Sequence, residues 1–317
     1  MIGKDPVSQG HESVMLEEVV EALKIRPGGV YVDGTFGRGG HTQAILSQLG
    51  PEGSMVAFDR DPDAIRAGRD VFAMESRLKL VHRPFSELAQ GCHEAGFDQG
   101  DGIFFDLGVS SPQLDTPSRG FSFINDGPLD MRMDPGQGEP ASAWLARVEA
   151  GELADVLFRF GDERYARRIA RAIVKEREVK AIETTDQLAA LVSKVIPHHE
   201  KSKHPATRTF QAIRIKVNDE LGQLERVLPQ AVRWLRPGGR LVVLSFHSLE
   251  HRRVKKFIRQ EVRGDDFPIE IPVLQSQLHP RLKSLKSRRP SKEEVANNPR
   301  SRSATLHFAE AMGDGNA

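Results

Sequence analysis

The strongest constraint on the fold comes from residues 30–41, which read Val-Tyr-Val-Asp-Gly-Thr-Phe-Gly-Arg-Gly-Gly-His. A short apolar run ends in a carboxylate, a glycine-rich turn follows, and a helical apolar pattern begins after it. This order predicts a strand, a tight loop and a helix, which together hold a nucleotide-like ligand at the carboxyl end of a parallel strand. Glycines let the backbone approach such a ligand closely because they lack a Cβ.

The spacing of these glycines argues against a dinucleotide. A G-x-G-x-x-G match from Gly37 places Thr42 where the last glycine should stand, whereas D-x-x-x-G-x-G-G fits Asp33, Gly37, Gly39 and Gly40. A carboxylate before the loop repels phosphate, which favours a ligand without a pyrophosphate. S-adenosylmethionine, with its ammonium and sulfonium, is the predicted cofactor; an ordinary tight turn is the alternative.

A second apolar run supports the nucleoside prediction. Residues 55–58 predict a buried strand that ends at Asp59. An acidic residue at this place can accept hydrogen bonds from both ribose hydroxyls. Asp61 stands before Pro62 and is the better candidate for the cap of the following helix, so we assign Asp59 to the ribose.

The order of predicted elements indicates an α/β protein. Strands and helices alternate up to about residue 116, which implies a doubly wound, mostly parallel, Rossmann-like sheet. Residues 117–217 contain no convincing strand and are predicted to form an inserted helical domain for substrate recognition, so the sheet domain comprises residues 1–116 and 218–317. The predicted strands are 30–33, 55–58, 78–82, 102–106, 241–246 and 305–308; the main helices are 153–160, 166–174, 188–195, 207–217, 221–235 and 249–262.

Composition excludes several classes of protein. Hydrophobic residues make up 38% and charged residues 28% of the 317 residues, and no apolar run approaches the length of a membrane span. Residues 1–12 are polar and do not form a secretory signal. The single Cys92 excludes an internal disulfide and a cysteine-based zinc site, and it is predicted to be a buried or neutral thiol in a helix. A cytoplasmic protein without a metal is predicted.

Basic residues gather in two clusters although the net charge is only +1. The first cluster recurs at helical spacing, and the second is predicted to lie in an exposed loop. Each is attractive to a phosphate backbone, although an isolated cluster is more often a solvated surface. The clusters are Arg164, Arg167, Arg168, Arg171, Lys175 and Arg177, and Arg281, Lys283, Lys286, Arg288 and Arg289 with Arg300 and Arg302.

A Ser-Pro loop follows the predicted strand that ends at Asp106. It contains Ser110, Ser111 and Pro112 and is similar to the loop of enzymes that methylate exocyclic amino groups of bases. The lone pair of such an amine is delocalised into the ring, so the nitrogen is a poor nucleophile. Acceptors on its N–H bonds favour a pyramidal nitrogen, and transfer is then direct and in line, with positioning as the largest contribution.

Five long motifs together closely resemble the bacterial 16S ribosomal RNA cytosine-N4 methyltransferase family, known as RsmH or MraW. The resemblance covers nearly the whole chain, and it implies a class I S-adenosylmethionine-dependent enzyme with an inserted helical domain. It further implies methylation of N4 of a cytidine in the decoding region of the small-subunit RNA. The motifs are residues 33–41, 106–115, 127–134, 204–211 and 245–250.

The resemblance also implies roles for particular residues. Phe85 is expected to pack against the adenine, unless it is a plain core residue. Gln113 stands where related DNA enzymes have a stacking aromatic, so the residue that stacks on the base is either elsewhere, at Phe121 or Phe123, or missing. The expected cofactor-binding residues are Asp33, Gly37, Gly39, Gly40, His41, Asp59, Phe85, Asp106 and Gln113; the catalytic ones are Ser110, Ser111 and Pro112; the substrate-binding ones are Phe121, Phe123, Arg132, Arg208, Gln211, Arg214, Asn218, His247, Arg288 and Arg289.

Two other functions stay open at this stage. A DNA methyltransferase acting on cytosine N4 or adenine N6 would use the same Ser-Pro loop on a flipped base. A cofactor-binding RNA assembly factor would need the fold but no turnover. A small-molecule substrate is less expected, because the helical insertion and two cationic clusters exceed what it needs. The sequence leaves the oligomeric state open, with a homodimer among the options.

Overall fold

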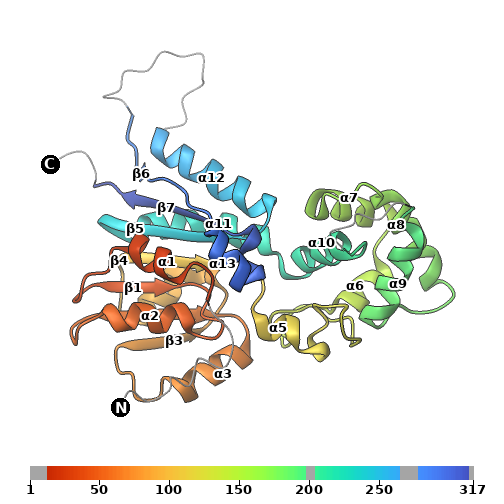
Figure 1. Ribbon diagram of the computed structural model, residues 1–317, viewed down its shortest axis with the longest axis horizontal. Coiled ribbons are helices and arrows are strands. Elements are labelled where there is room, and N and C mark those ends of the chain that lie inside the picture. The colour runs from red at the N-terminus through yellow and green to blue at the C-terminus, as the bar shows by residue number, and fades with distance from the viewer. Residues whose placement is uncertain (1–12, 198–203, 265–277, 314–317) are drawn as a thin grey trace. The chain divides into compact units, whose positions relative to one another are not determined.

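The computed structural model describes residues 13–197, 204–264 and 278–313 (Figure 1). Residues 1–12, which the sequence analysis judged not to be a secretory signal, lie outside this range. The chain divides into two compact units, which we call the sheet unit (Met1–Gly108 and Gly222–Ala317) and the helical unit (Val109–Leu221). These borders differ from the predicted domain borders, which fall after residues 116 and 217.

The sheet unit is built on a seven-stranded sheet with the order β3-β2-β1-β4-β5-β7-β6 (Figure 1). The neighbours from β3 to β5 pair in parallel, whereas β7 is antiparallel to both β5 and β6. The chain order reverses at β1, which lies between β2 and β4, and ligands bind at such a switch point in open α/β sheets. The strands are β1 (Val30–Asp33), β2 (Ser54–Asp59), β3 (Leu78–His82), β4 (Gly100–Asp106), β5 (Leu235–Ser245), β6 (Leu282–Ser284) and β7 (Thr305–Ala311).

Side chains alternate between the two faces of this sheet. In β4, Ile103 and Phe105 pack on one face, together with residues of α4, α11 and α12. Phe104 packs on the other, together with residues of α1 and α2. Helices therefore cover both faces, and the predicted doubly wound α/β class is confirmed.

The helices of the sheet unit begin where the sequence supplies a turn or a cap. Asp61 caps α3 by accepting a hydrogen bond from the backbone N–H of Asp63 over 3.0 Å, as predicted. Cys92 is buried in α4, and burial raises the pKa of its thiol to about 12, which confirms an inert thiol. The helices are α1 (Leu16–Leu23), α2 (Gly40–Gln48), α3 (Pro62–Val71), η1 (Phe85–Glu87), α4 (Leu88–Glu94), α11 (Glu220–Trp234, whose first two residues belong to the helical unit), α12 (Ser248–Arg263), α13 (Lys292–Asn297) and η4 (Pro299–Ser303).

All predicted strands are present, but the chain differs from the prediction in two places. Helix α11 ends at Trp234, and β5 begins at Leu235 rather than at the predicted residue 241. The added start of the strand contains Pro237 and is mostly exposed and irregularly paired. Residues 282–284, predicted to lie in a loop, form the short edge strand β6. The charge of Lys283 and the cations on either side of the strand hide its pattern, because edge strands tolerate charge.

The helical unit has its own hydrophobic core. Leu153 and Leu157 of α7, Ile169 and Ile173 of α8, and Ile213 of α10 are completely buried in it. The predicted helices of this region are all present, and no strand is assigned between residues 117 and 197 or between 204 and 217. The helices are α5 (Ser111–Asp115), η2 (Pro117–Arg119), α6 (Ala141–Arg147), α7 (Ala150–Gly161), α8 (Ala166–Arg177), α9 (Thr185–Val195) and α10 (Thr207–Asn218).

Candidate functional site

The glycine-rich loop after β1 connects three strands at their carboxyl ends. The backbone N–H of Gly34 donates to the carbonyl of Phe104 in β4, and that of Phe36 donates to Phe58 in β2, both over 2.8 Å. Gly37 (φ 56°) and Gly39 (φ 77°) adopt left-handed backbone conformations that favour glycine. The loop therefore lies across the switch point between β2 and β4, where the sequence predicted the ligand.

Asp33 holds this loop in place through hydrogen bonds. Its carboxylate is buried and accepts hydrogen bonds from the Thr35 backbone N–H over 3.0 Å and from the Thr42 hydroxyl over 2.8 Å. The Thr35 hydroxyl in turn accepts a bond from the backbone N–H of Asp106 over 2.6 Å. Asp33 thus ties the loop to the start of α2, and Thr35 ties it to the end of β4.

Asp59, predicted to bind the ribose, also shapes the loop. Its two carboxylate oxygens accept hydrogen bonds from the backbone N–H groups of Gly37 and Asp61, each over 2.8 Å. These bonds place the carboxylate at the end of β2 beside the glycine turn.

Three carboxylates lie at neighbouring strand ends, and the pKa of each is raised. Burial raises the pKa of Asp33 to about 6, with bonds from Thr35 and Thr42 opposing the shift. Burial likewise raises the pKa of Asp59 to about 6. The pKa of Asp106 is raised further, by burial first and then by the charges of Asp33 and Glu250. Its Oδ1 atom is buried and has no hydrogen-bond partner among the described residues.

This cluster fits a cationic ligand. Buried carboxylates that lack a compensating charge hold protons, and a positive ligand relieves their mutual repulsion. S-adenosylmethionine carries an ammonium and a sulfonium, and the cradle of glycine backbone and carboxylates has the chemistry to hold it. A phosphate-bearing ligand would be repelled by the same groups.

His41 lies in the first turn of α2 and contributes no charge at neutral pH. Burial lowers the pKa of its imidazole to about 4. Its Nε2 atom lies 3.0 Å from the carbonyl oxygen of Val14 and therefore carries the proton, since a carbonyl only accepts. Its Nδ1 atom lies 3.6 Å from Oδ2 of Asp106, too far for a hydrogen bond.

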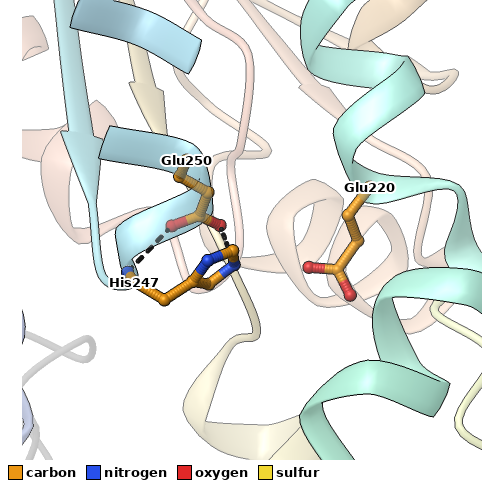
Figure 2. A group of neighbouring side chains, drawn as sticks. All are labelled: Glu220, His247 and Glu250. Atoms are coloured by element: carbon orange, nitrogen blue, oxygen red, sulfur yellow. Dashed lines mark hydrogen bonds and ion pairs between the residues drawn. The ribbon is translucent and has the colours of Figure 1, made fainter. Parts of the chain in front are cut away.

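A further acidic residue, Glu250, lies at the start of α12 (Figure 2). Its charge acts on Asp106. Glu250 is buried and accepts hydrogen bonds from the backbone N–H groups of Phe246 (2.9 Å) and His247 (3.3 Å). The Nε2 atom of His247 lies 3.0 Å from Oε1 of Glu250. Glu220, drawn in the same figure, belongs to the helical unit, where it pairs with Arg214.

Phe85 and the Ser-Pro loop occupy different units. Phe85 is half-buried at the start of η1, and its ring centroid lies 5.6 Å from that of Phe105. In the helical unit, Ser110 precedes α5 and Gln113 closes a capping box, its Oε1 accepting from the Ser110 backbone N–H over 3.0 Å. The buried Gln113 therefore fixes the loop that carries Ser111 and Pro112.

The two aromatic candidates for stacking differ in burial. Phe121 belongs to the core of the helical unit, with 6% of its surface exposed, which leaves it no free face for a base. Phe123 is partly exposed and stacks on the His204 ring with a centroid distance of 4.5 Å. Phe210 packs edge-on against it at 4.8 Å. Phe123 is thus the better placed of the two.

Most of the polar motif residues of the helical unit bond to their own unit. Asn218 is buried, accepts from the Met133 backbone N–H over 2.8 Å and donates to the Met131 carbonyl over 2.7 Å. Gln211 donates to the Phe160 carbonyl over 3.1 Å. The partners of the two bidentate arginines are Asp130 for Arg132 and Glu220 for Arg214, and Arg208 is half-buried.

The second basic cluster is not the free loop that the sequence predicted. Arg281 pairs with the buried Glu261 over 2.7 Å. Arg288 donates to Glu21 of α1 over 2.9 Å, and its backbone bridges to Leu306. Arg289 is exposed and has no ion-pair partner among the described residues. Only part of this cluster is therefore available to a phosphate backbone.

Three residues of the site escaped the sequence analysis. Thr35 and Thr42 fix Asp33. Thr35 stands within residues 33–41 and Thr42 directly after them, where the glycines and charges carried the prediction. Glu250 stands three residues after His247, a spacing typical of a capping box at a helix start. That spacing could have indicated a buried carboxylate.

The strand order, the antiparallel β7 and the acid-lined glycine loop after β1 define a class I S-adenosylmethionine-dependent methyltransferase fold. Residues 8–312 match the model of the MraW methylase family. The chain belongs to this family and is a methyltransferase. It is also 54% identical over 306 residues to the ribosomal RNA small subunit methyltransferase H of Chromohalobacter salexigens, covering 96% of this chain and 92% of that protein.

Solved structures resemble the chain more distantly. An rRNA methylase from Streptococcus thermophilus aligns with a TM-score of 0.43 at 11% identity, covering 99% of each chain. A SAM-dependent O-methyltransferase from Thermotoga maritima aligns with a TM-score of 0.42 at 10% identity, covering 98% of this chain and 70% of that one. Likenesses at this level carry no conclusion about function. In the described part of the chain, no helix is long and apolar enough to cross a membrane.

Proposed function

We propose that this protein transfers the methyl group of S-adenosylmethionine to the exocyclic N4 of a cytidine in the decoding region of 16S ribosomal RNA. Membership of the MraW methylase family supports methyl transfer. The name of the 54% identical relative, ribosomal RNA small subunit methyltransferase H, supports small-subunit RNA as the substrate. The position N4 and the decoding region come from the motif resemblance described above.

The observation that carries the cofactor assignment is the cluster of Asp33, Asp59 and Asp106 at neighbouring strand ends. Burial raises the pKa of all three carboxylates, so the site favours a ligand that brings positive charge. When bound, the cofactor supplies an electrophilic methyl group on sulfur. Asp59 would accept hydrogen bonds from the ribose hydroxyls, and Asp106 would face the charged end of the donor or its adenine.

The remaining cofactor contacts follow from the loop geometry. Gly37, Gly39 and Gly40 would let the backbone lie against the donor, and His41 would border it as a neutral imidazole. Phe85 would pack against the adenine, which its half-buried position allows. Gln113 would act through the Ser-Pro loop, because its side chain already accepts from the backbone N–H of Ser110.

The acceptor amine would be positioned by Ser110, Ser111 and Pro112. A hydroxyl or backbone carbonyl that accepts the amine N–H bonds favours a pyramidal nitrogen whose lone pair points at the methyl carbon. Transfer would replace the C–S bond of the donor by a new N–C bond, with the sulfur keeping the electron pair. One amine proton would then leave to water or a nearby acceptor, which gives the neutral N4-methylated base.

The helical region 117–217 is proposed to recognise the RNA, with Phe123 stacking on the base. Arg132, Arg208, Gln211, Arg214, Asn218 and His247 are proposed to line or shape the RNA pocket, and Arg288 and Arg289 to attract its backbone. Phe121 would support the pocket from the core. We further propose action in the cytoplasm on the small ribosomal subunit, by a chain that acts alone or as a homodimer.

The direct test is a radiolabel-transfer assay with labelled S-adenosylmethionine and three substrates: DNA, free 16S RNA and small ribosomal subunits. We expect label in ribosomal RNA, and mass-spectrometric mapping should locate it on a single cytidine. Labelling of DNA alone would overturn the ribosomal assignment. Ser111→Ala combined with Pro112→Ala should abolish transfer while calorimetry still detects cofactor binding; unchanged transfer would remove the Ser-Pro loop from the reaction.

A further inference from the structure

Helix α12 carries a line of cations that the sequence analysis did not single out. Arg252, Lys255, Lys256 and Arg259 are exposed and recur at three- and four-residue steps. The buried residues Val254 and Ile258 of the same helix pack into the core of the sheet unit. At these spacings, the cations occupy the face of α12 opposite to its buried face. We call these four cations the α12 stripe.

The α12 stripe is free for an external anion. None of its four side chains has an ion-pair partner among the described residues, whereas the neighbouring Arg253 pairs with Glu225 over 2.8 Å. The second basic cluster differs in this respect, because Arg281 and Arg288 pair with glutamates of the sheet unit. Free cations gain most from a phosphate, since no internal partner must first be released.

Helix α12 starts at the carboxyl edge of the sheet, where the cofactor is proposed to bind. The helix begins at Ser248, directly after the loop that follows β5, and its first turn holds Glu250, whose charge contributes to the environment of Asp106. The stripe starts at Arg252, two residues after Glu250. From Arg252 to Arg259 it extends about 10 Å along the helix, about three nucleotide steps of a strand.

A further cation lies beside the stripe. His251, on the same helix, has its ring centroid 4.8 Å from that of the buried His307 in β7. The charges of Lys255 and Arg289 both act on His251, so these two cations lie near the same ring although they come from different parts of the chain. Arg289 is exposed and free of an ion-pair partner among the described residues, and it extends the cationic surface beyond α12.

We infer that the α12 stripe, together with Arg289, binds the phosphate backbone of the ribosomal RNA next to the nucleotide that is methylated. This inference rests on the proposed function. A base that reaches the donor must enter at the carboxyl edge of the sheet, and its strand must then pass the start of α12. Positive charge without internal partners at that place suits an RNA strand, and four cations on one helix face give continuous contact.

The test compares two variants with equal loss of charge in the sheet unit. The first is Arg252→Gln with Lys256→Gln and Arg259→Gln. The matched control is Lys24→Gln with Arg66→Gln and Arg69→Gln, which removes three exposed cations away from α12. KM and kcat for small ribosomal subunits are measured at several salt concentrations, and calorimetry gives the Kd of S-adenosylmethionine for each variant.

We expect the stripe variant to raise KM on the order of tenfold at low salt and to flatten the slope of log KM against log salt by roughly one per cation removed. Its kcat and cofactor Kd should match those of the unchanged protein, and the control should change neither KM nor the slope. A stripe variant with the KM and slope of the control would overturn the inference. So would loss of binding to phosphatidylglycerol vesicles at an unchanged KM, because the stripe would then serve a lipid surface.

The same experiment separates this inference from the proposed function. If the unchanged protein transfers no methyl group to small subunits, the proposed function fails, and fluorescence anisotropy with labelled 16S RNA fragments then tests the stripe directly. Weaker, less salt-dependent RNA binding by the stripe variant than by the control would still support the inference. Equal binding by both variants would overturn it.

Discussion

At the scale of single residues, the site is defined by carboxylates at neighbouring strand ends, of which Asp33 is buried and Asp59 and Asp106 are half-buried. Asp33 and Asp59 each accept at least two hydrogen bonds from neighbouring backbone or hydroxyl groups, yet burial raises the pKa of both carboxylates to about 6. The hydrogen bonds fix the geometry of the charged form, while the surroundings disfavour its charge. A cationic donor changes this balance by favouring ionisation, which couples its binding to proton release.

The first prediction concerns the pH dependence of cofactor binding. Without cofactor, the folded protein holds more protons on Asp33 and Asp59 than the unfolded chain does, because the pKa of both groups is raised from 3.8 to about 6. The free energy of unfolding therefore falls as the pH rises through this range. The cofactor binds the ionised form, so its affinity should rise across this range and level off above pH 7. Below pH 6 the change should be about tenfold per pH unit for each proton released.

Calorimetry in buffers of different ionisation enthalpy measures that proton release. We expect net release at pH 5.5 and little at pH 8. Proton uptake at pH 5.5, or an affinity independent of pH between 5 and 8, would contradict the assignment of these carboxylates to the donor site.

The second prediction concerns Asp59 alone. Asp59→Ala should weaken S-adenosylmethionine binding about ten- to hundredfold, because a charge-assisted pair of hydrogen bonds is worth roughly 1.5–3 kcal/mol. The loop contact to the Gly37 backbone N–H is lost as well, so the melting temperature should also fall. Calorimetry measures the affinity. Asp63→Ala, which removes an exposed carboxylate from the first turn of α3, serves as the control. Unchanged affinity would remove Asp59 from the ribose.

At the scale of elements, the sequence predicts most strands well but misses the short strand β6 and the start of β5. Strands such as 30–33 and 78–82 match their predicted bounds because apolar residues and turns mark both ends. Strand β6 escaped prediction because its three residues, Leu282–Ser284, are too few to show an alternation and lie among cations. The exposed start of β5 escaped it because Pro237 and Gly238 are typical of a helix stop, whereas here the pairing of Leu235 with Gly100 overrides them.

The candidate site was likewise predictable only in part. Asp33, Asp59 and Asp106 follow from strand ends, and the structure brings them together. Polar residues such as Asn218 cannot be assigned from a motif, because a buried hydrogen-bonding role and a substrate contact use the same residue types. The α12 stripe has the spacing already recognised in α8, yet the apolar residues Val254, Phe257 and Ile258 interrupt it and make it less conspicuous.

The third prediction concerns the element that Asn218 supports. Its side chain hydrogen-bonds the Met131 carbonyl and the Met133 backbone N–H. Met131 has a φ of 64°, which is costly for a residue other than glycine. Asn218→Ala leaves a buried N–H and a buried carbonyl without partners. It should destabilise the helical unit by about 2–4 kcal/mol.

Trp144 lies in the helical unit and Trp234 in the sheet unit, and they are the only two tryptophans. In a Trp234→Phe background, urea unfolding followed by Trp144 fluorescence reports the helical unit. Gln211→Ala, which removes a single half-buried hydrogen bond, serves as the matched control and should cost less. If Asn218→Ala unfolds at the same urea concentration as the parent, the supporting role of Asn218 is wrong.

At the scale of the whole molecule, segments near the two ends of the described chain contact each other in the sheet unit. The backbone N–H of Met15 donates to Glu294 over 2.7 Å, and Arg288 donates to Glu21 over 2.9 Å. Strand β7 fits between β5 and β6 and is antiparallel to both. Sequence patterns cannot foresee such contacts, since their partners stand 279 and 267 residues apart.

The fourth prediction asks which of these long-range contacts stabilises the sheet unit. Leu306 of β7 is completely buried between β5 and the helices on one sheet face, so Leu306→Ala should cost about 2–5 kcal/mol. Arg288 and Glu21 are 41% and 65% exposed, and exposed ion pairs contribute little, so Arg288→Ala should cost less than about 1 kcal/mol. Burial, rather than the ion pair, would then hold the chain ends together.

Urea unfolding in a Trp144→Phe background measures both changes through Trp234, whose indole N–H donates to the Phe97 carbonyl in the sheet unit. A larger loss for Arg288→Ala than for Leu306→Ala would mean that the ion pair, and not the apolar face of β7, closes the sheet. Raising the salt concentration separates the two causes, because an exposed ion pair weakens with salt whereas burial of Leu306 does not.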